Sequence, residues 1–170
     1  MNNSQLKGVY LHGYQGFVTD EKKEFLNQIG NIYAPTIDYD TDYTILHRLY
    51  EQFRNEKLDF VSGTSLGGIL SYHLALLLNV PCLLLNPAVT AMNQIESFIP
   101  QEALSKLPQK EVTVLVGMKD EVIEPKFQLS FFESINKQTN NIRILINDNL
   151  EHLVPLENFV DAFKIFLKKP

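Results

Sequence analysis

The stretch DFVSGTSLGGILSYHLALLL, residues 59–78, decides how the rest of this chain is interpreted. It begins with apolar residues typical of a short buried strand and ends with an apolar run typical of a buried helix. Between the two, residues 63–67 read GTSLG and match the pattern G-x-S-x-G. A serine at such a strand-to-helix turn adopts a strained backbone conformation that exposes its hydroxyl. The residues two before and two after it approach closely, so only very small side chains fit there.

The chemical interpretation of this turn is that Ser65 is a nucleophile. The helix that follows directs its free N–H groups and its positive end at the serine, where an oxyanion would form. The alternative is a glycine-rich turn in which Ser65 only caps the helix, as serine often does. The position of the motif between a strand and a long apolar helix favours the nucleophile.

The composition indicates an ordinary globular protein. The 170 residues predict one domain, over 1–170, with 45% apolar and 21% charged residues. The net charge of −5 and the lack of a Lys/Arg cluster argue against a nucleic-acid partner.

The sequence also predicts a cytoplasmic protein that does not enter a membrane. The one cysteine, Cys82, lies in an apolar strand, which indicates a buried small hydrophobe in a reducing compartment. The N-terminal sequence MNNSQLKG has no apolar signal-peptide core. The apolar run over 67–89 is interrupted by polar residues and by Pro81, which favours a buried helix and strand over a membrane span.

Strands and helices are expected to alternate along the whole chain. Besides the strand before Ser65, strands are predicted at 6–11, 32–39, 82–85, 111–117 and 141–147. Helices are predicted at 20–29, 42–56, 65–78 and 125–137, with a final helix after Pro155. Pro35 indicates that its strand lies at a sheet edge, because proline cannot donate to the ladder. Residues 88–110 are irregular, with one short helix expected near 93–98.

This alternation predicts an α/β fold of three layers, with a mostly parallel sheet of about six strands and helices on both faces. In such sheets ligands bind beyond the carboxyl ends of the strands. Four predicted strand ends carry reactive groups: the sequence His12-Gly13-Tyr14, then Ser65, Asp120 and His152. Oxyanion loop, serine, acid and histidine occur in the chain order expected for an α/β-hydrolase.

The chain resembles a minimal α/β-hydrolase, and in particular the small bacterial esterases of the YqiA type. The matching pieces are YLHGYQG, GTSLGG, LLLNPAV, GMKDEV and EHLV, spread from residue 9 to residue 154. Relative to the full superfamily, the resemblance implies that the first strands are missing and that no lid domain is inserted. One departure lies in the loop before His152, which reads NDNLE where these relatives usually carry glycine.

The chemistry gives each of these residues a role. Ser65 needs a base within hydrogen-bond reach, and His152 is the candidate because it follows the last strand. Asp120 would hold the imidazole in the correct tautomer and stabilise its cation. Glu121 and Glu124 are rival acids within one turn of Asp120.

The oxyanion hole is expected to consist of two backbone N–H groups, those of Tyr14 and Leu66, with Gly13 allowing the loop to turn. His12 is expected to support this loop structurally. His47 and His73 lie within predicted helices, and we expect a surface position or core packing for both. Asn86 either shapes the floor of the pocket or simply ends its strand.

The sequence predicts neither a metal nor a cofactor. No His/Cys/carboxylate spacing is typical of a metal site, and no glycine-rich loop is typical of phosphate binding.

Residues 88–110 leave room for about one short helix, which can wall one side of a pocket but cannot enclose a long chain. Ile95, Phe98 and Ile99 are the predicted apolar wall for the substrate. We therefore expect acyl groups of about two to six carbons, by the free energy of burying each methylene.

The predicted function is that of a serine hydrolase that cleaves small carboxylic esters through an acyl-enzyme on Ser65. A thioesterase with the same three residues is the nearest alternative. A non-catalytic ligand receptor of α/β-hydrolase-like fold is another, although a receptor has no need to keep Ser65, Asp120 and His152 together. A structural or interaction protein would instead expose an apolar patch. The expected partner is a small-molecule ester, and the oligomeric state is not predicted.

Overall fold

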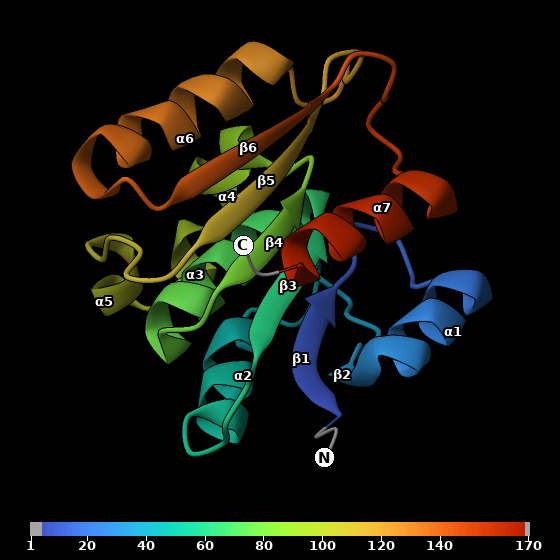
Figure 1. Cartoon of the computed structure of the whole chain (residues 1–170). Coiled ribbons are helices and arrows are strands. Elements are labelled where there is room, and N and C mark those ends of the chain that lie inside the picture. The colour runs from blue at the N-terminus through green and yellow to red at the C-terminus, as the bar shows by residue number, and fades with distance from the viewer. Residues whose placement is uncertain (1–4, 169–170) are drawn as a thin grey trace.

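The computed structural model describes residues 5–168, which form a six-stranded sheet covered by helices on both faces (Figure 1). The strand order is β2-β1-β3-β4-β5-β6, and every neighbouring pair is parallel. The strands are β1 (Leu6–Leu11), β2 (Gly30–Tyr33), β3 (Phe60–Thr64), β4 (Cys82–Leu85), β5 (Val112–Gly117) and β6 (Ile142–Asn147). The predicted α/β fold of three layers is confirmed. The first half of the N-terminal MNNSQLKG, residues 1–4, lies outside the described residues.

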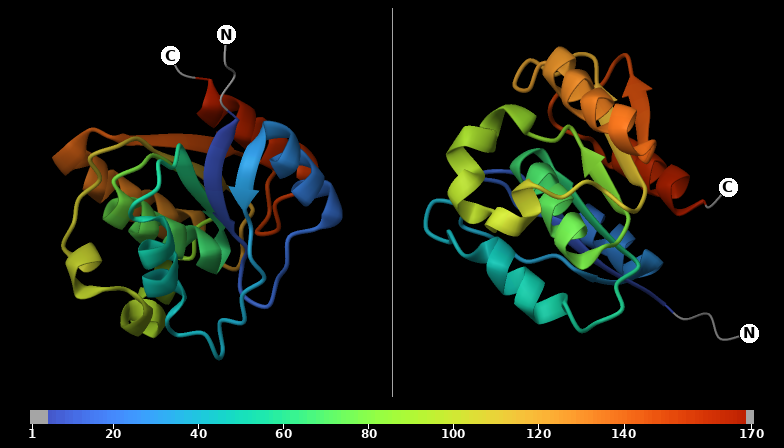
Figure 2. Two further views of the ribbon diagram at one scale, coloured as in Figure 1. Left: turned by 90° about the horizontal axis from the view of Figure 1, so that it is seen from below. Right: turned by 90° about the vertical axis from the view of Figure 1, so that its left-hand side faces the viewer.

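The helices divide between the two faces of the sheet. Helices α1 (Asp20–Ile29) and α7 (Leu156–Leu167) cover one face, and α2 (Ile45–Phe53), α3 (Ser65–Leu78) and α6 (Pro125–Thr139) cover the other (Figures 1 and 2). Residues 89–104 form only short pieces on the α3 side: η1 (Val89–Ala91), α4 (Met92–Ile95), η2 (Glu96–Phe98) and α5 (Gln101–Leu104). No inserted lid domain is present among the described residues.

Two elements are shorter than the sequence predicts. Strand β2 ends at Tyr33, before Pro35, and does not extend to residue 39. Proline cannot donate to the ladder, and the chain then turns where Asp38 O accepts from the N–H groups of Thr41 and Asp42. Because that turn occupies residues 38–42, α2 begins only at Ile45. The predicted edge position of β2 is confirmed.

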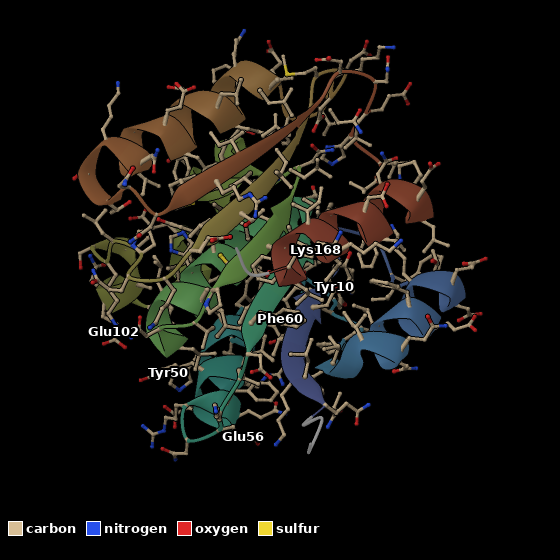
Figure 3. All side chains as sticks on the ribbon, in the orientation of Figure 1. Tyr10, Tyr50, Glu56, Phe60, Glu102 and Lys168 are labelled. Carbon is tan, nitrogen blue, oxygen red and sulfur yellow. The ribbon has the colours of Figure 1, made fainter. Side chains whose placement is uncertain are left out.

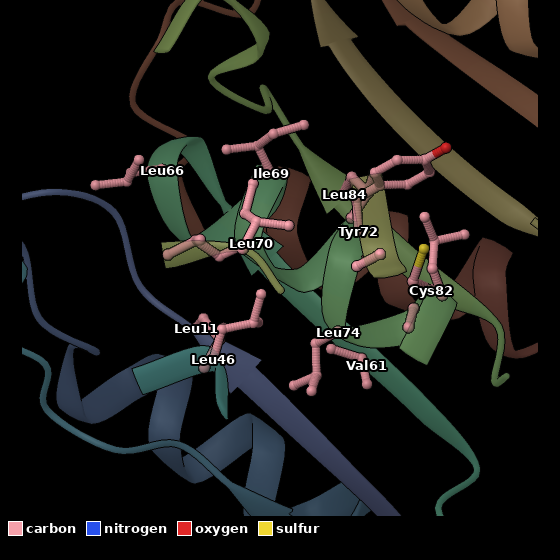
Figure 4. Packing of buried hydrophobic residues seen from close by; sticks show 14 of the residues in the cluster. Leu11, Leu46, Val61, Leu66, Ile69, Leu70, Tyr72, Leu74, Cys82 and Leu84 are labelled. Carbon is pink, nitrogen blue, oxygen red and sulfur yellow. The ribbon is translucent and has the colours of Figure 1, made fainter. Parts of the chain in front are cut away.

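Helix α3 is the centre of the larger hydrophobic cluster. Nearly all of its side chains are buried, because it packs on the sheet with one side and against α2 and α5 with others. Figure 4 shows its leucines among Leu11, Leu46 and Val61. Cys82 is fully buried in the same cluster, and burial raises the pKa of its thiol. Ser65, the nucleophile candidate, is therefore the first residue of the most deeply buried helix of the described chain.

The opposite face of the sheet is packed with aromatic rings. Tyr10 and Phe60 lie beneath α7 (Figure 3), with ring centroids 5.3 Å from Phe159 and 5.9 Å from Phe163 respectively. The rings meet edge to face, the arrangement that their quadrupoles favour. Burial raises the pKa of Tyr10 to about 12, although its hydroxyl bonds Thr64 Oγ1 at 2.8 Å. This packing holds α7 against the face of the sheet that is opposite to α3.

Among residues 5–168, no helix has both the length and the apolar character that crossing a membrane requires.

Candidate active site

The turn at Ser65 has the geometry that its sequence predicts. Ser65 itself has a φ of +53°, a left-handed value that a residue with a side chain adopts only at a cost. A methyl group on Gly63 would overlap the carbonyl oxygen of Gly67, and one on Gly67 would overlap the carbonyl oxygens of Leu11 and His12. The glycines are therefore needed for close backbone approach, and the strain displays the Ser65 side chain at the end of β3.

His152 and Asp120 come to this serine from two other strand ends. Ser65 Oγ lies 3.0 Å from His152 Nε2, and His152 Nδ1 lies 2.9 Å from Asp120 Oδ2. A carboxylate can only accept, so Nδ1–H donates to Asp120, and Nε2 is left to accept the hydroxyl proton of Ser65. The imidazole is 18% exposed, whereas the Asp120 side chain is fully buried. The three residues follow β3, β5 and β6.

The carboxylate of Asp120 is held by four hydrogen bonds. Its Oδ1 accepts from the N–H groups of Val122 at 2.9 Å and Ile123 at 2.8 Å. Its Oδ2 accepts from Gln128 Nε2 at 3.2 Å as well as from His152. Both oxygens are thus fully used, and the plane of the carboxylate is fixed.

The two rival acids lie elsewhere. Glu121 and Glu124 are both exposed, and Glu124 pairs with Lys126 at 2.6 Å. Of the three acidic residues, the structure brings Asp120 to the imidazole.

Sequence reasoning missed Gln128. This side chain is completely buried on α6, and its Nε2 also donates to Ile123 O at 2.8 Å. Its Oε1 has no hydrogen-bond partner among the described residues. The available signal was a polar residue at helical spacing from the buried Phe132 and Ile135, on the otherwise apolar face of the helix.

The loop before His152 turns without a glycine. Asn147 Oδ1 accepts from Asn149 N at 3.0 Å, and Asn147 O accepts from Leu150 N at 3.3 Å. None of the residues 147–151 has a positive φ. Because the asparagine side chain closes the turn, no glycine is required, and His152 still reaches Ser65.

Asn86 connects three parts of the site. It follows β4, has a φ of +43° and is fully buried. Its Oδ1 accepts from Gly117 N at 2.8 Å, and its Nδ2 donates to Glu151 O at 2.8 Å and His152 O at 3.1 Å. The sequence left its role open between pocket floor and strand end. The structure gives it contacts to the loops that carry both Asp120 and His152.

The loop after β1 lies against Ser65. A methyl group on Gly13 would lie 3.3 Å from Ser65 Cβ, which shows how closely the two backbones approach. The N–H of Tyr14 donates to no other described residue, and the N–H of Leu66 belongs to the first turn of α3, where no intrahelical acceptor exists. The Tyr14 side chain points away to Asp40, 2.8 Å from its hydroxyl, and this hydrogen bond raises the tyrosine pKa.

His12 supports this loop, as predicted. Its Nε2 accepts from Ile37 N at 2.8 Å, so its Nδ1–H donates to Gly13 O at 2.7 Å. The other two histidines lie within helices: His47 is exposed, and His73 is buried in α3. Burial lowers the pKa of His73 to about 4, and the neighbouring Ala103 backbone acts in the opposite direction. Neither ring nitrogen of His73 makes a hydrogen bond of good geometry within residues 5–168.

The predicted substrate wall is buried in the core. Ile95, Phe98 and Ile99 are 3%, 8% and 5% exposed and pack in the cluster around α3. They support the segment after β4 from beneath, and contact between these three residues and a substrate stays a prediction. A surface cavity of about 440 Å³ lies between this segment and α6, and its lining is Val89, Thr90, Met92, Asn93, Phe127, Ser130 and Phe131.

A second cavity lies far from Ser65. It has a volume of about 340 Å³ and is lined by the C-terminal end of α3, residues 106–110 and Val112 at the start of β5. This is the amino edge of the parallel sheet, opposite to the edge that carries Ser65. The part of the chain that the structure describes contains no group of three His, Cys, Asp or Glu residues placed to hold a metal ion.

Comparison with known proteins gives one family match and several structures of similar fold. The model of an uncharacterised protein family, UPF0227, matches residues 7–126. No curated protein sequence matches the chain.

Solved structures match over nearly the whole length. Est1E from Butyrivibrio proteoclasticus, solved with bound ferulic acid, is 18% identical with a TM-score of 0.69, over 98% of this chain and 90% of its own. Acyl-protein thioesterase 2 from Zea mays is 13% identical with a TM-score of 0.67, over 95% and 92%. An esterase of Pyrococcus furiosus is 15% identical with a TM-score of 0.65, over 99% and 83%. At these identities the likeness shows a shared fold.

Proposed function

The chain belongs to the uncharacterised protein family UPF0227, and we propose that it hydrolyses small carboxylic esters through an acyl-enzyme on Ser65. The observation that carries this proposal is the line of contacts from Ser65 Oγ through the His152 imidazole to the buried Asp120 carboxylate. The esterases and the thioesterase that share the fold support the same class of reaction.

In the acylation step, His152 Nε2 takes the hydroxyl proton as Ser65 Oγ attacks the carbonyl carbon of the ester. The N–H groups of Leu66 and Tyr14 donate to the carbonyl oxygen and stabilise the negative charge that develops on it. His152 then gives the proton to the departing alkoxide, and the alcohol leaves. The Asp120 carboxylate holds the ring in the correct tautomer and stabilises the imidazolium.

Deacylation repeats the sequence with water. His152 takes a proton from water, the resulting hydroxide attacks the acyl carbon, and the proton returns to Ser65 Oγ as the carboxylic acid leaves. No cofactor or metal enters either step.

The test is covalent labelling of Ser65. A fluorophosphonate probe should modify the native protein, and peptide mass spectrometry should place the adduct on residue 65. Ser65→Ala should abolish both the labelling and the hydrolysis of an acetyl ester. Ser105→Ala, which removes an exposed serine hydroxyl elsewhere, is the matched control and should change neither. A folded protein that is not labelled would favour the ligand-receptor alternative.

A thioesterase is the second candidate, because an acyl-protein thioesterase shares the fold. The same acyl-enzyme would form from a thioester, with a thiolate as the leaving group. The two functions separate when one acyl group is offered on an oxygen and on a sulfur leaving group, and the specificity constants are compared.

We also propose that the protein acts in the cytoplasm. Cys82 is free and fully buried, as expected for a protein of a reducing compartment. Cell fractionation with detection of the untagged protein checks this.

A further inference from the structure

The segment after β4 contacts Ser65, His152 and the strand end that precedes Asp120. Ala88 N donates to Ser65 O at 2.9 Å, two residues after Asn86 donates to the carbonyls of Glu151 and His152. The Asn86 side chain also binds Gly117 N at 2.8 Å, three residues before Asp120. One short segment therefore joins the backbone of the nucleophile to the backbones of the acid and base loops.

The partners of Asn86 determine how its amide is oriented. Gly117 N can only donate, so the amide oxygen must face it, and the two carbonyls can only accept, so the NH₂ group must face them. The side chain is completely buried, so water does not replace any partner that is lost. Its φ of +43° suits asparagine, which tolerates the left-handed region better than most residues.

Among the described residues, the backbone carbonyl of His152 accepts its hydrogen bond from Asn86 Nδ2, at 3.1 Å, and the next tie along the chain is Val154 O, which accepts from Lys22 Nζ at 2.7 Å. The preceding loop is tied to the strand ends by Leu150 O, which accepts from Lys119 N at 3.0 Å. Asn86 provides the hydrogen bonds that fix the two peptide groups next in the chain, those of Glu151 and His152. The position of the imidazole relative to Ser65 thus depends on the Asn86 amide.

We propose that Asn86 is a positioning residue, whose amide sets the placement of the His152 imidazole between Ser65 and Asp120. Its effect on hydrolysis rests on the proposed function above, whereas its effect on the geometry of His152 does not. Asn86 touches no reacting atom.

The first experiment measures hydrolysis by Asn86→Gly and Asn86→Asp. Glycine keeps the left-handed backbone but removes the amide, and aspartate keeps the size and the Gly117 contact but cannot donate to the two carbonyls. Both should lower kcat about tenfold to a hundredfold with KM within about threefold, because a small displacement of a catalytic group costs that much. Asn140→Gly is the matched control, since Asn140 is also left-handed, with a φ of +57°, but is exposed at the end of α6. It should stay within about twofold of the native kcat, as surface changes usually do.

A double-mutant cycle separates positioning from general destabilisation. In a His152→Ala background, Asn86→Gly should have almost no further effect on the residual rate, because the group that it positions is gone. If Asn86→Gly lowers the residual rate by the same factor in both backgrounds, or if Asn86→Asp keeps the native kcat, the positioning role is refuted.

The second experiment needs no substrate. Proton NMR of the folded protein should show a downfield signal of the His152 Nδ1–H that donates to Asp120, identified by its loss in His152→Ala. Asn86→Gly should broaden or remove this signal, and Asn140→Gly should retain it. A signal that is unchanged in Asn86→Gly overturns the inference. If instead the signal is lost while the native protein hydrolyses no ester, the proposed function fails and the positioning role stands.

Discussion

The Asp120 carboxylate receives four hydrogen bonds from three different sources: its own loop, α6 and the imidazole. The loop contributes two adjacent N–H groups just before α6 begins, so part of the orientation is set locally. Gln128 contributes from the first turn of α6. Because hydrogen bonds use both oxygens, the orientation of the carboxylate towards the imidazole is fixed.

Replacement of Asp120 by asparagine should lower kcat by about three to four orders of magnitude, because the amide NH₂ would force the imidazole into the wrong tautomer. The fold should survive, since the amide oxygen can still accept from Val122 and Ile123. The new NH₂ faces Gln128 Nε2, so this one hydrogen bond is lost, while Gln128 keeps its bond to Ile123 O. Hydrolysis rates and a thermal melt check both parts. Glu121→Gln, at the exposed neighbour, should cost little, and the opposite ranking would move the acid to Glu121.

At the scale of elements, the turn between β3 and α3 depends on a close contact between backbones that leaves no space for a side chain. Gly67 faces two carbonyl oxygens of the β1 end, and Gly63 faces the backbone of α3. The nearest atom at each position is a backbone carbonyl oxygen, which cannot move aside as a flexible side-chain end could. The strain at Ser65 is therefore maintained by three packed elements, β1, β3 and α3.

Gly67→Ala should destabilise the protein by about 3 kcal/mol and abolish labelling of Ser65, because the methyl group would push α3 away from β1. Gly68→Ala is the matched control in the next position, where a methyl group would meet its nearest atoms at 3.2 Å. It should cost clearly less in a denaturant titration. Equal costs at the two positions would show that the close approach of Gly67 is not what holds the turn.

The short pieces between β4 and β5 limit what can cover an acyl group. Their inner side carries Ile95, Phe98 and Ile99, which are buried in the core. A surface cavity remains between these pieces and α6. We expect the specificity constant to rise over acyl groups of about two to six carbons and then level off, because further methylenes find no apolar wall. A homologous series of acyl esters on one leaving group measures this. A steady rise out to dodecanoyl would mean that the chain forms a long apolar tunnel.

At the scale of the whole molecule, burial of His73 couples stability to acid. Burial lowers its pKa to about 4 in the folded protein, whereas the unfolded chain binds the proton below about 6.5. The neutral His73 ring contributes fully to the free energy of unfolding above the pKa of the unfolded chain, and this contribution is lost as the pH falls towards 4. The free energy of unfolding falls as the pH falls in this range because the unfolded state binds more protons than the folded state.

Between pH 7 and pH 5, His73 should therefore account for a loss of about 2 kcal/mol in the free energy of unfolding. His73→Phe keeps a ring against Tyr72, whose centroid lies 5.1 Å away, and should remove most of this pH dependence. Denaturant titrations at the two pH values measure it, with the exposed His47→Ala as control. If the free energy of unfolding of His73→Phe falls between the two pH values by as much as that of the native protein, another group is responsible.

The sequence was informative wherever one pattern determines the structure locally. The strands, the parallel sheet and the turn at Ser65 could be predicted from apolar runs and from glycine spacing. That the strand ends gather Asp120 and His152 at Ser65 was predicted from chain order, and the distances agree. The length of β2 was overestimated, because the apolar residues beyond Pro35 are buried by packing outside the ladder.

The contacts of Asn86 and Gln128 could not be predicted in this way. Asn86 binds residues 31, 65 and 66 positions away, and no local pattern carries that information. Gln128 was detectable only as a polar residue on an apolar face. The burial of Ile95, Phe98 and Ile99 was equally hidden, because an apolar residue in an irregular segment can line a surface or pack beneath it.

The origin of the site at three strand ends also fixes the order in which it arises during protein synthesis. Ser65 and its strained turn follow β3, whereas Asp120 and His152 follow β5 and β6, which the ribosome makes later. The ribosome makes the N-terminal part of a chain first, whereas a domain generally folds as a unit. A nascent chain that has completed β3 and α3 thus carries the hydroxyl with no base beside it. On the proposed function, Ser65 gains its base only when the sheet is finished, so unfinished chains should hydrolyse no ester.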